Sequence, residues 1–370
     1  MITLQNGRKR TELENIMDDK SMQRWIHWWN GSAIDRPVMQ IYAPLDKPKT
    51  DAGYYANRTS DPQVVWNDTE NIFALNIAHL YNNLFLAEAA HIINPNWSAG
   101  NACFFGCEPT FTGSTVWTKP LELLEDGYPP VEFDKNNKWL KFMLEFTQYG
   151  AKHEYFKDGR FNLVPHVGNS VADTLSLIRS DEELMVDIIE NPEWVRQSVK
   201  KIADALYYVS DKLMEIIGYD NKTYASWWSC VANKPVATAD ADISCMLSPK
   251  QFEDFFLEQI AEQISRAPYS QYHLDGAGAL VHLDALLSLS QLNAIQWVPG
   301  AGREAIMQWI PVIKKIQAAK KGVIVYATPK ELPGLLDEIK NPEGLCVSVN
   351  CANEREAYEL LAFVEGKCGV

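Results

Sequence analysis

The chain has 370 residues, of which 46% are hydrophobic and 22% are charged, and its formal net charge is −14. This acidic balance argues against nucleic acid and against anionic membrane surfaces as partners. No apolar run approaches the roughly 20 residues that span a bilayer, which excludes a membrane-spanning class. The first residues hold no apolar signal core, and the seven cysteines show no Cys-x-x-Cys spacing, so we expect reduced thiols and a cytoplasmic protein.

Residues 1–90 are predicted to form an irregular, helical N-terminal elaboration. Residues 8–30 hold a helical pattern with an aromatic face, and residues 61–90 hold a second helical pattern that runs through Leu84 and Leu86. A short strand is predicted between them at 38–42. No composition shift or linker separates this part from the rest, so we expect one domain over 1–370.

Strands and helices alternate regularly from residue 161 onward. The longest predicted helix begins at Pro192 and carries apolar residues at three-to-four spacing as far as Leu213. The strand candidates along the whole chain are 38–42, 91–94, 161–167, 223–230, 270–274, 293–298, 322–326 and 345–350. Alternation of this kind favours a parallel sheet, and about eight strand–helix units favour closure into a single (β/α)8 barrel.

The stretch 271–303 is the strongest candidate for a functional site. It predicts a strand that ends in His273-Leu274-Asp275, then a turn, a helix and a second strand, which is a β-α-β unit. Residues at i and i+2 of a strand point the same way, so His273 and Asp275 share one face. Because ligands of parallel α/β folds bind at the carboxyl ends of strands, this pair is placed where a site is expected.

Other polar and aromatic residues lie at or near predicted strand ends and are candidates for substrate binding. Asp240 and Asp242 share the loop after the 223–230 strand, and we expect one of them, Asp240 in our assignment, to face the pocket. A local cap or core packing is the alternative role for several of these residues. The full set of candidates is Tyr42, His166, Trp227, Trp228, Asp240 and Trp297.

Several short motifs occur in a characteristic order between about residues 160 and 366. They are LVPHVGNSVADTLSLIRSDEELMVDIIENPEWV, ASWWSCV, LSPKQFEDFF, YHLDG, LNAIQW, VIVYATPKEL and SVNCANEREAYELL. In this order and spacing the chain resembles the uroporphyrinogen decarboxylase superfamily. The resemblance implies a (β/α)8 barrel and one of two chemistries. One is porphyrinogen decarboxylation, and the other is zinc-dependent methyl transfer between corrinoid proteins and thiols or other acceptors.

The chain resembles the methyltransferase branch of the superfamily in the positions of that branch's metal ligands. These ligands are a His-x-Cys on one strand and a Cys on the last strand. The matching positions here are His273, Asp275 and Cys351, and Glu108 completes the shell if it reaches the barrel mouth. Asp in place of Cys gives a harder ligand set that still suits zinc. The residues alone leave other roles open. His273 and Asp275 can pair with each other or serve as a metal-free general acid or base, and Cys351 can simply fill space.

The decarboxylase branch fits less well. Resemblance to this branch would imply a site with an N-terminal Arg cluster, an Asp on the second strand and a C-terminal His. Here Arg36 stands alone, the second strand end reads Asn94-Pro95-Asn96, and Cys351 occupies the place of the His. Because a substrate with many carboxylates needs Arg forks, we expect a zinc-dependent methyltransferase. It moves a methyl group between a corrinoid (cobalamin) protein and a small thiol or methylated compound. The alternative is a decarboxylase-like lyase or a metal-free barrel that binds a small molecule.

Overall fold

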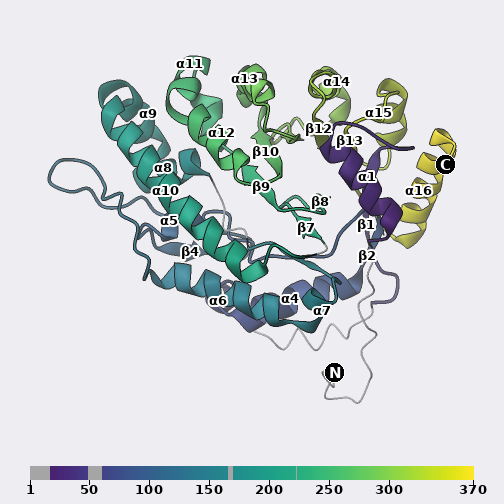
Figure 1. The fold of residues 1–370 in the computed structure, drawn as a ribbon, viewed down its shortest axis with the longest axis horizontal. Helices are drawn as coiled ribbons and strands as arrows, with labels where there is room; N and C mark the ends of the chain where they lie inside the picture. Colours follow the sequence, from purple (N-terminus) through teal and green to yellow (C-terminus); the bar gives the residue numbers. More distant parts are fainter. Residues whose placement is uncertain (1–16, 49–60, 166–169, 222) are drawn as a thin grey trace, which may run out of the picture.

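The structure is a computed structural model that describes residues 17–48, 61–165, 170–221 and 223–370. Its centre is a seven-stranded sheet in which all neighbours are parallel except the pair β1–β2 (Figure 1). In order across the sheet the strands are β2 (Asn83–Ala87), β1 (Val38–Pro44), β13 (Leu345–Asn350), β12 (Gly322–Tyr326), β11 (Ala294–Val298), β10 (Tyr269–Asp275) and β9 (Val236–Ala239). The predicted α/β class with a large parallel sheet is therefore confirmed.

Three two-stranded sheets accompany the large one. The parallel pair is β3 (Ile92–Ile93) with β6 (Asn162–Leu163), and the antiparallel pairs are β4 (Pro109–Phe111) with β5 (Val116–Thr118) and β7 (Tyr224–Ala225) with β8 (Val231–Ala232). Within the part of the chain that the structure describes, the strand ladder does not close on itself. In a closed barrel, the outer edge of β1 would pair with the next parallel strand. Here this edge pairs with the antiparallel strand β2 instead.

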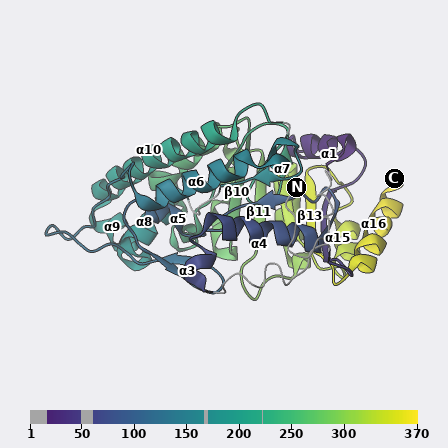
Figure 2. The ribbon, with the colours of Figure 1, turned by 90° about the horizontal axis from the view of Figure 1, so that it is seen from below.

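Helices lie on both sides of the sheet. In Figure 1 the helices α9, α11, α13, α14 and α15 follow one another in an arc above it, α10 runs down the left side of the view, and α4 and α6 lie below it. Figure 2 shows α9 and α16 at opposite ends of the molecule. The helices are α1 (Asp19–Trp29), α3 (Pro62–Val65), α4 (Thr69–Asn82), α5 (Gly100–Cys103), α6 (Lys138–Lys152), α7 (Glu154–Lys157), α8 (Val171–Arg179), α9 (Asp181–Glu190), α10 (Pro192–Ile217), α11 (Pro249–Phe252), α12 (Glu258–Ser265), α13 (Leu283–Ser288), α14 (Ile310–Ala318), α15 (Leu332–Glu338) and α16 (Glu354–Cys368).

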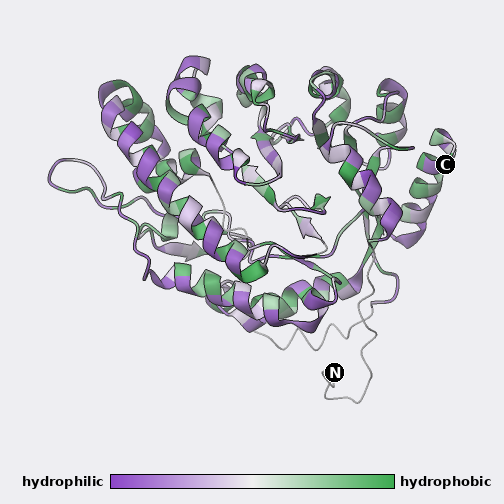
Figure 3. Ribbon diagram, in the orientation of Figure 1, coloured by the Kyte–Doolittle hydropathy of each residue, from purple (hydrophilic) through white to green (hydrophobic). Residues whose placement is uncertain are grey.

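The long helix α10 shows how the sequence pattern produces the packing. Its apolar residues at three-to-four spacing form one stripe, and the helix has mixed colouring in Figure 3 because its polar residues lie on the other side. The residues of the predicted stripe, all buried, are Val195, Val199, Ile202, Leu206, Val209 and Leu213. The predicted helix from Pro192 is thereby confirmed.

Two predictions of local structure are wrong. Residues 83–87 were expected to continue the helix of 61–90, but α4 ends at Asn82 and the chain turns into strand β2. Residues 223–230 were expected to form one barrel strand, but they enter a hairpin whose turn requires a positive φ of 60° at Ser229. The strand that joins the large sheet is β9, which begins just after Pro235.

Helix α1 covers the amino-terminal ends of the sheet strands. Its three tryptophans, Trp25, Trp28 and Trp29, are at most 1% exposed. The indole Nε1 of Trp28 donates to the carbonyl oxygen of Val323 at 3.3 Å. Gly322 has to be glycine here, because a Cβ would lie 2.9 Å from the ring of Trp28. The opposite, carboxyl ends of the strands are left for a site.

A buried ion cluster joins α1 to β1. The carboxylate of Glu88 is fully buried and accepts hydrogen bonds from Arg24 Nη1 at 3.0 Å, Arg36 Nη1 at 2.7 Å and Arg36 Nη2 at 3.0 Å. It also accepts from the backbone N–H of Met39 in β1 at 3.0 Å. A buried charge is tolerated only when it is paired and hydrogen-bonded, so this cluster fixes the position of α1 on the sheet.

Asp35 belongs to the same cluster and makes stability depend on pH. It accepts from Arg24 Nε at 2.9 Å and Nη2 at 2.8 Å, and these bonds hold the pKa of Asp35 below its ordinary value of 3.8. A carboxyl with a lowered pKa stabilises the fold above pH 3.8, and this stabilisation is lost as the pH falls towards the folded-state pKa. We expect Asp35→Asn to lower the free energy of unfolding by about 2 kcal/mol at pH 7 and by less at about pH 3, measured by urea unfolding. An equal loss at both pH values would contradict this.

Candidate metal centre

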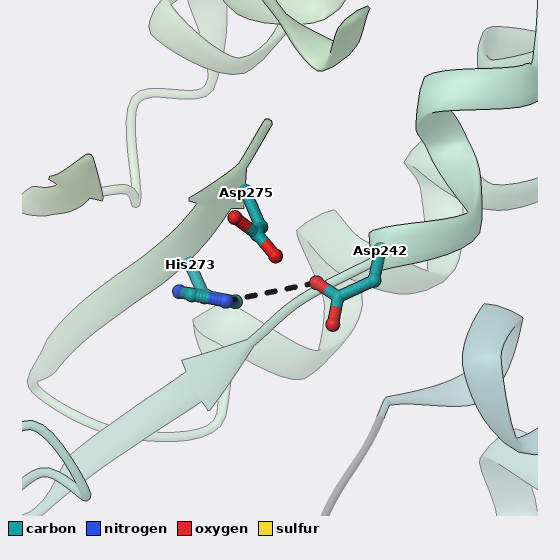
Figure 4. Close-up of side chains that lie close together, drawn as sticks. All are labelled: Asp242, His273 and Asp275. Atoms are coloured by element: carbon teal, nitrogen blue, oxygen red, sulfur yellow. Dashed lines mark ion pairs between the residues drawn. The ribbon is translucent and has the colours of Figure 1, made fainter. Parts of the chain in front are cut away.

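Three side chains converge at the carboxyl ends of β9 and β10. His273 and Asp275 are two residues apart in β10 and extend from the same face of the strand. Asp242 begins the short 3-10 helix Asp242–Met246, which follows β9 almost at once. The potential ligand atoms of the three residues lie within 4.8 Å of one another, and His273 Nε2 is 3.7 Å from Asp242 Oδ1 (Figure 4).

The hydrogen bonds of His273 determine which ring nitrogen is available. Its Nδ1 lies 2.5 Å from Oε1 of Gln296, the residue that faces it in the neighbouring strand β11. Gln296 in turn donates from Nε2 to the hydroxyl of Tyr326 in β12. An amide oxygen can only accept, so Nδ1 carries the hydrogen and Nε2 presents its lone pair to Asp242. Two electron-rich atoms that face each other in this way require a proton or a metal cation between them.

Trp228 holds the plane of the imidazole. Its ring stacks on that of His273 with a centroid separation of 5.3 Å and an interplanar angle of 17°. Trp228 lies in the turn between β7 and β8, the turn that requires the positive φ at Ser229. The local conformation that prevents residues 223–230 from forming a single strand thus places an indole over the candidate ligand.

Asp275 contributes a carboxylate oxygen that lacks a partner in the described part of the chain. Its Oδ1 is buried and has no hydrogen-bond partner among the described residues. A buried carboxylate oxygen without a partner costs several kcal/mol, whereas a metal ion would satisfy it. The close approach to His273 Nε2 and Asp242 supplies the remaining ligands of such an ion.

Further carboxylates make the site strongly acidic. Burial, followed by the charge of Asp240, raises the pKa of Asp242 to about 6, although nearby His273 opposes the rise. Burial and the charges of Asp240 and Asp242 raise the pKa of Asp173 well above its ordinary value of 3.8. This accumulation of acids destabilises the ion-free site and favours a cation.

The amino-terminal end of α8 holds the loop that carries Asp242. Asp173 Oδ2 accepts from the backbone N–H of Asp242 at 2.8 Å, and its Oδ1 accepts from that of Ile243 at 2.8 Å. Asp240 Oδ1 accepts from the backbone N–H of Ser170 at 2.5 Å, and Ser170 Oγ accepts from the backbone N–H of Asp240 at 2.9 Å. Asp240, expected to bind substrate, is engaged in this support and is 4% exposed.

Several predicted site residues line one cavity beside this group. The cavity has a volume of about 520 Å³, and Tyr42, Trp227, Trp228 and Cys351 are among its lining residues. The structure therefore brings together three of the aromatic residues predicted from sequence. It places Cys351 on the cavity wall, outside the three-residue group, because β13 is separated from β10 by β12 and β11. Burial raises the pKa of the Cys351 thiol to about 11.

The remaining predicted residues lie elsewhere. Trp297 is fully buried and packs edge-on against Trp309 at 5.1 Å, so it reaches neither the cavity nor the ligand group. Glu108 has an exposed side chain that pairs with Lys138 at 3.1 Å. His166 lies outside the described residues.

Gln296 and Tyr326 are supporting residues that the sequence reasoning did not single out. Gln296 is 3% exposed in a strand of otherwise apolar residues, and a lone amide at such a position is a usable signal. Asp242 was recognised only as a neighbour of Asp240. Its place in the ligand group depends on β9 being the strand beside β10.

Comparisons with known proteins show a likeness to a solved structure. No family model and no curated protein matches the chain. Among solved structures, a methyltransferase from Methanosarcina mazei superposes with a TM-score of 0.61 over 95% of this chain and 100% of that one, at 12% sequence identity. At this identity the likeness shows a shared fold. No helix in the described ranges has the length and hydropathy to cross a membrane.

Proposed function

We propose that this protein is a zinc-dependent methyltransferase that moves a methyl group between a corrinoid protein and a small thiol or methylated compound. The observation that carries the proposal is the group Asp242, His273 and Asp275, with the buried, unpartnered Oδ1 of Asp275. The fold shared with a methyltransferase supports it. We further propose that the sheet belongs to a (β/α)8 barrel, in which β3 and β6 would complete the wall between β9 and the β1 edge that β2 covers.

The residues present fit a catalytic zinc ion. One imidazole nitrogen and two carboxylate oxygens are suitable ligands, and three protein ligands leave a fourth position for a substrate. When bound, zinc would supply a Lewis acid that lowers the pKa of a coordinated thiol or water. The chain itself keeps His273 in the ligand tautomer through Gln296, holds Asp242 in place through Asp173, and covers the imidazole face with Trp228.

The decarboxylase alternative lacks its substrate-binding groups. Arg36, the one Arg expected to serve it, is 2% exposed and is bound to Glu88. Among the described residues that line the 520 Å³ cavity there is no Lys or Arg. A substrate with several carboxylates would therefore find no forked cation to bind it.

Zinc analysis of two alanine variants distinguishes the structural ligand set from the one implied by the superfamily resemblance. We expect protein purified without chelator to hold close to one zinc per chain, Asp242→Ala to lose it, and Cys351→Ala to keep it. Each variant removes one potential ligand from the same end of the sheet, so each is the control for the other. Loss of zinc in Cys351→Ala alone would instead favour His273, Asp275 and Cys351. Wild-type protein without metal under all conditions would leave the metal-free small-molecule barrel as the better account.

A further inference from the structure

The 520 Å³ cavity is connected to the candidate metal centre through two aromatic side chains. Trp228 lines the cavity and stacks on His273. Tyr326 also lines it, and its hydroxyl accepts the hydrogen bond from Gln296, the residue that orients His273. A molecule in this cavity therefore contacts the groups that support a metal ligand. The volume lies in the range of small-molecule sites.

The cavity wall carries no formal charge among the residues that the structure describes. No Asp, Glu, Lys or Arg lines it. Burial lowers the pKa of His79 below its ordinary value of 6.5 and raises the pKa values of Tyr42, Tyr326 and Cys351, so these groups are neutral at pH 7. This neutrality stands out beside the four carboxylates at the metal centre and a chain charge of −14.

The neutral wall combines flat aromatic faces with amides. Tyr42 and Phe85 meet edge to face at 5.5 Å, and Trp227 and Trp228 lie 6.0 Å apart. Asn94 also lines the cavity, and its side-chain amide makes no hydrogen bond to another described residue, so this amide is available to a ligand. Aromatic faces pack well against a planar molecule, and an amide can bond to an ether or hydroxyl oxygen.

We propose that this cavity binds an uncharged, planar compound, such as an aromatic methyl ether. Within the proposed function, on which this assignment of role rests, that compound is the small methylated substrate. A sulfonate or carboxylate would lose its hydration without gaining a cation. A methylammonium ion would gain cation–π attraction to the aromatic rings, about 2 kcal/mol in a desolvated site, but no carboxylate to offset the rest of its lost hydration. Both charged classes are therefore disfavoured.

Three ring compounds of similar size test the ligand class by calorimetry. They are methoxybenzene, phenyltrimethylammonium and benzenesulfonate, which are neutral, cationic and anionic. We expect methoxybenzene to bind at least about tenfold more tightly than either ion, since an unpaired charge is costly to bury. The titrations use full-length protein treated with chelator, so their outcome does not depend on whether the protein binds zinc. Tighter binding of an ion, or no binding of any of the three, would overturn the proposal.

A charge introduced at Asn94 tests whether the compounds bind in this cavity. Asn94→Asp is nearly isosteric and adds one carboxylate to the wall, so we expect phenyltrimethylammonium to bind about fivefold or more tightly than to wild type. The matched control is Asn353→Asp, which adds the same charge at the N-cap of α16, where Asp also caps and which does not line the cavity. An equal response of the two variants would place the binding elsewhere and overturn the proposal.

Discussion

Replacement of Asp275 by alanine is expected to lower the zinc affinity by more than about 100-fold. Loss of a group that only orients a ligand lowers metal affinity 10–100-fold, and Asp275 would be a direct ligand. Its Oδ1 has no hydrogen-bond partner among the described residues, so the change breaks no hydrogen bond at that oxygen. The variant should therefore fold at least as stably as ion-free wild type, while zinc binding, measured by competition with a chelating dye, weakens.

Asp284→Ala is the matched control for this variant. Asp284 has an exposed side chain in α13, outside the ligand group, and its removal changes the net charge by the same amount. We expect this control to bind zinc as wild type does, because charges at the exposed surface are screened. Equal zinc affinities of wild type and Asp275→Ala would remove Asp275 from the ligand set.

Replacement of Glu88 by alanine is expected to lower the free energy of unfolding by about 3–5 kcal/mol. The change leaves the guanidinium groups of Arg24 and Arg36, which are 7% and 2% exposed, without their shared carboxylate. It also leaves the backbone N–H of Met39 without its partner. Because these groups join α1 to the sheet, we expect destabilisation of the sheet and its helices together rather than of one helix.

Urea unfolding measures the loss of unfolding free energy in Glu88→Ala, and Glu145→Ala is the control variant. Glu145 is exposed on α6, and an exposed substitution of this kind changes stability by about 0.5 kcal/mol or less. A loss in Glu88→Ala no larger than that of the control would mean that the buried arginines find other partners.

The fold was predictable where local signals and long-range pairing agree. The strands from β10 to β13 form a parallel ladder, and their observed bounds differ from the predicted ones by one residue at most. The sequence signals failed at 83–87 and 223–230. Leu84 and Leu86 fit a helix as well as a strand, and their pairing with β1 decides between the two. The tight turn at Ser229 depends on a backbone conformation that the sequence does not signal.

The site was predictable within one strand and less so between strands. His273 and Asp275 share a face because of strand geometry alone, and the structure brings their ligand atoms together. The third member required the neighbour of β10 to be known. With the preceding strand placed at 223–230, Asp242 lay well beyond a strand end, whereas it is three residues beyond the end of β9. Cys351 matches the superfamily pattern but lies at the end of a strand that does not adjoin β10.

Methyl transfer from methylcobalamin to a panel of small thiols, followed anaerobically by the visible spectrum, tests the central claim most directly. Zinc-loaded wild-type protein is predicted to convert the methylcobalamin spectrum to that of demethylated cobalamin with at least one thiol. Asp275→Ala and chelator-treated protein are predicted to leave it unchanged. An unchanged spectrum with every thiol, from protein that holds one zinc per chain, would contradict the assignment of this centre to methyl transfer.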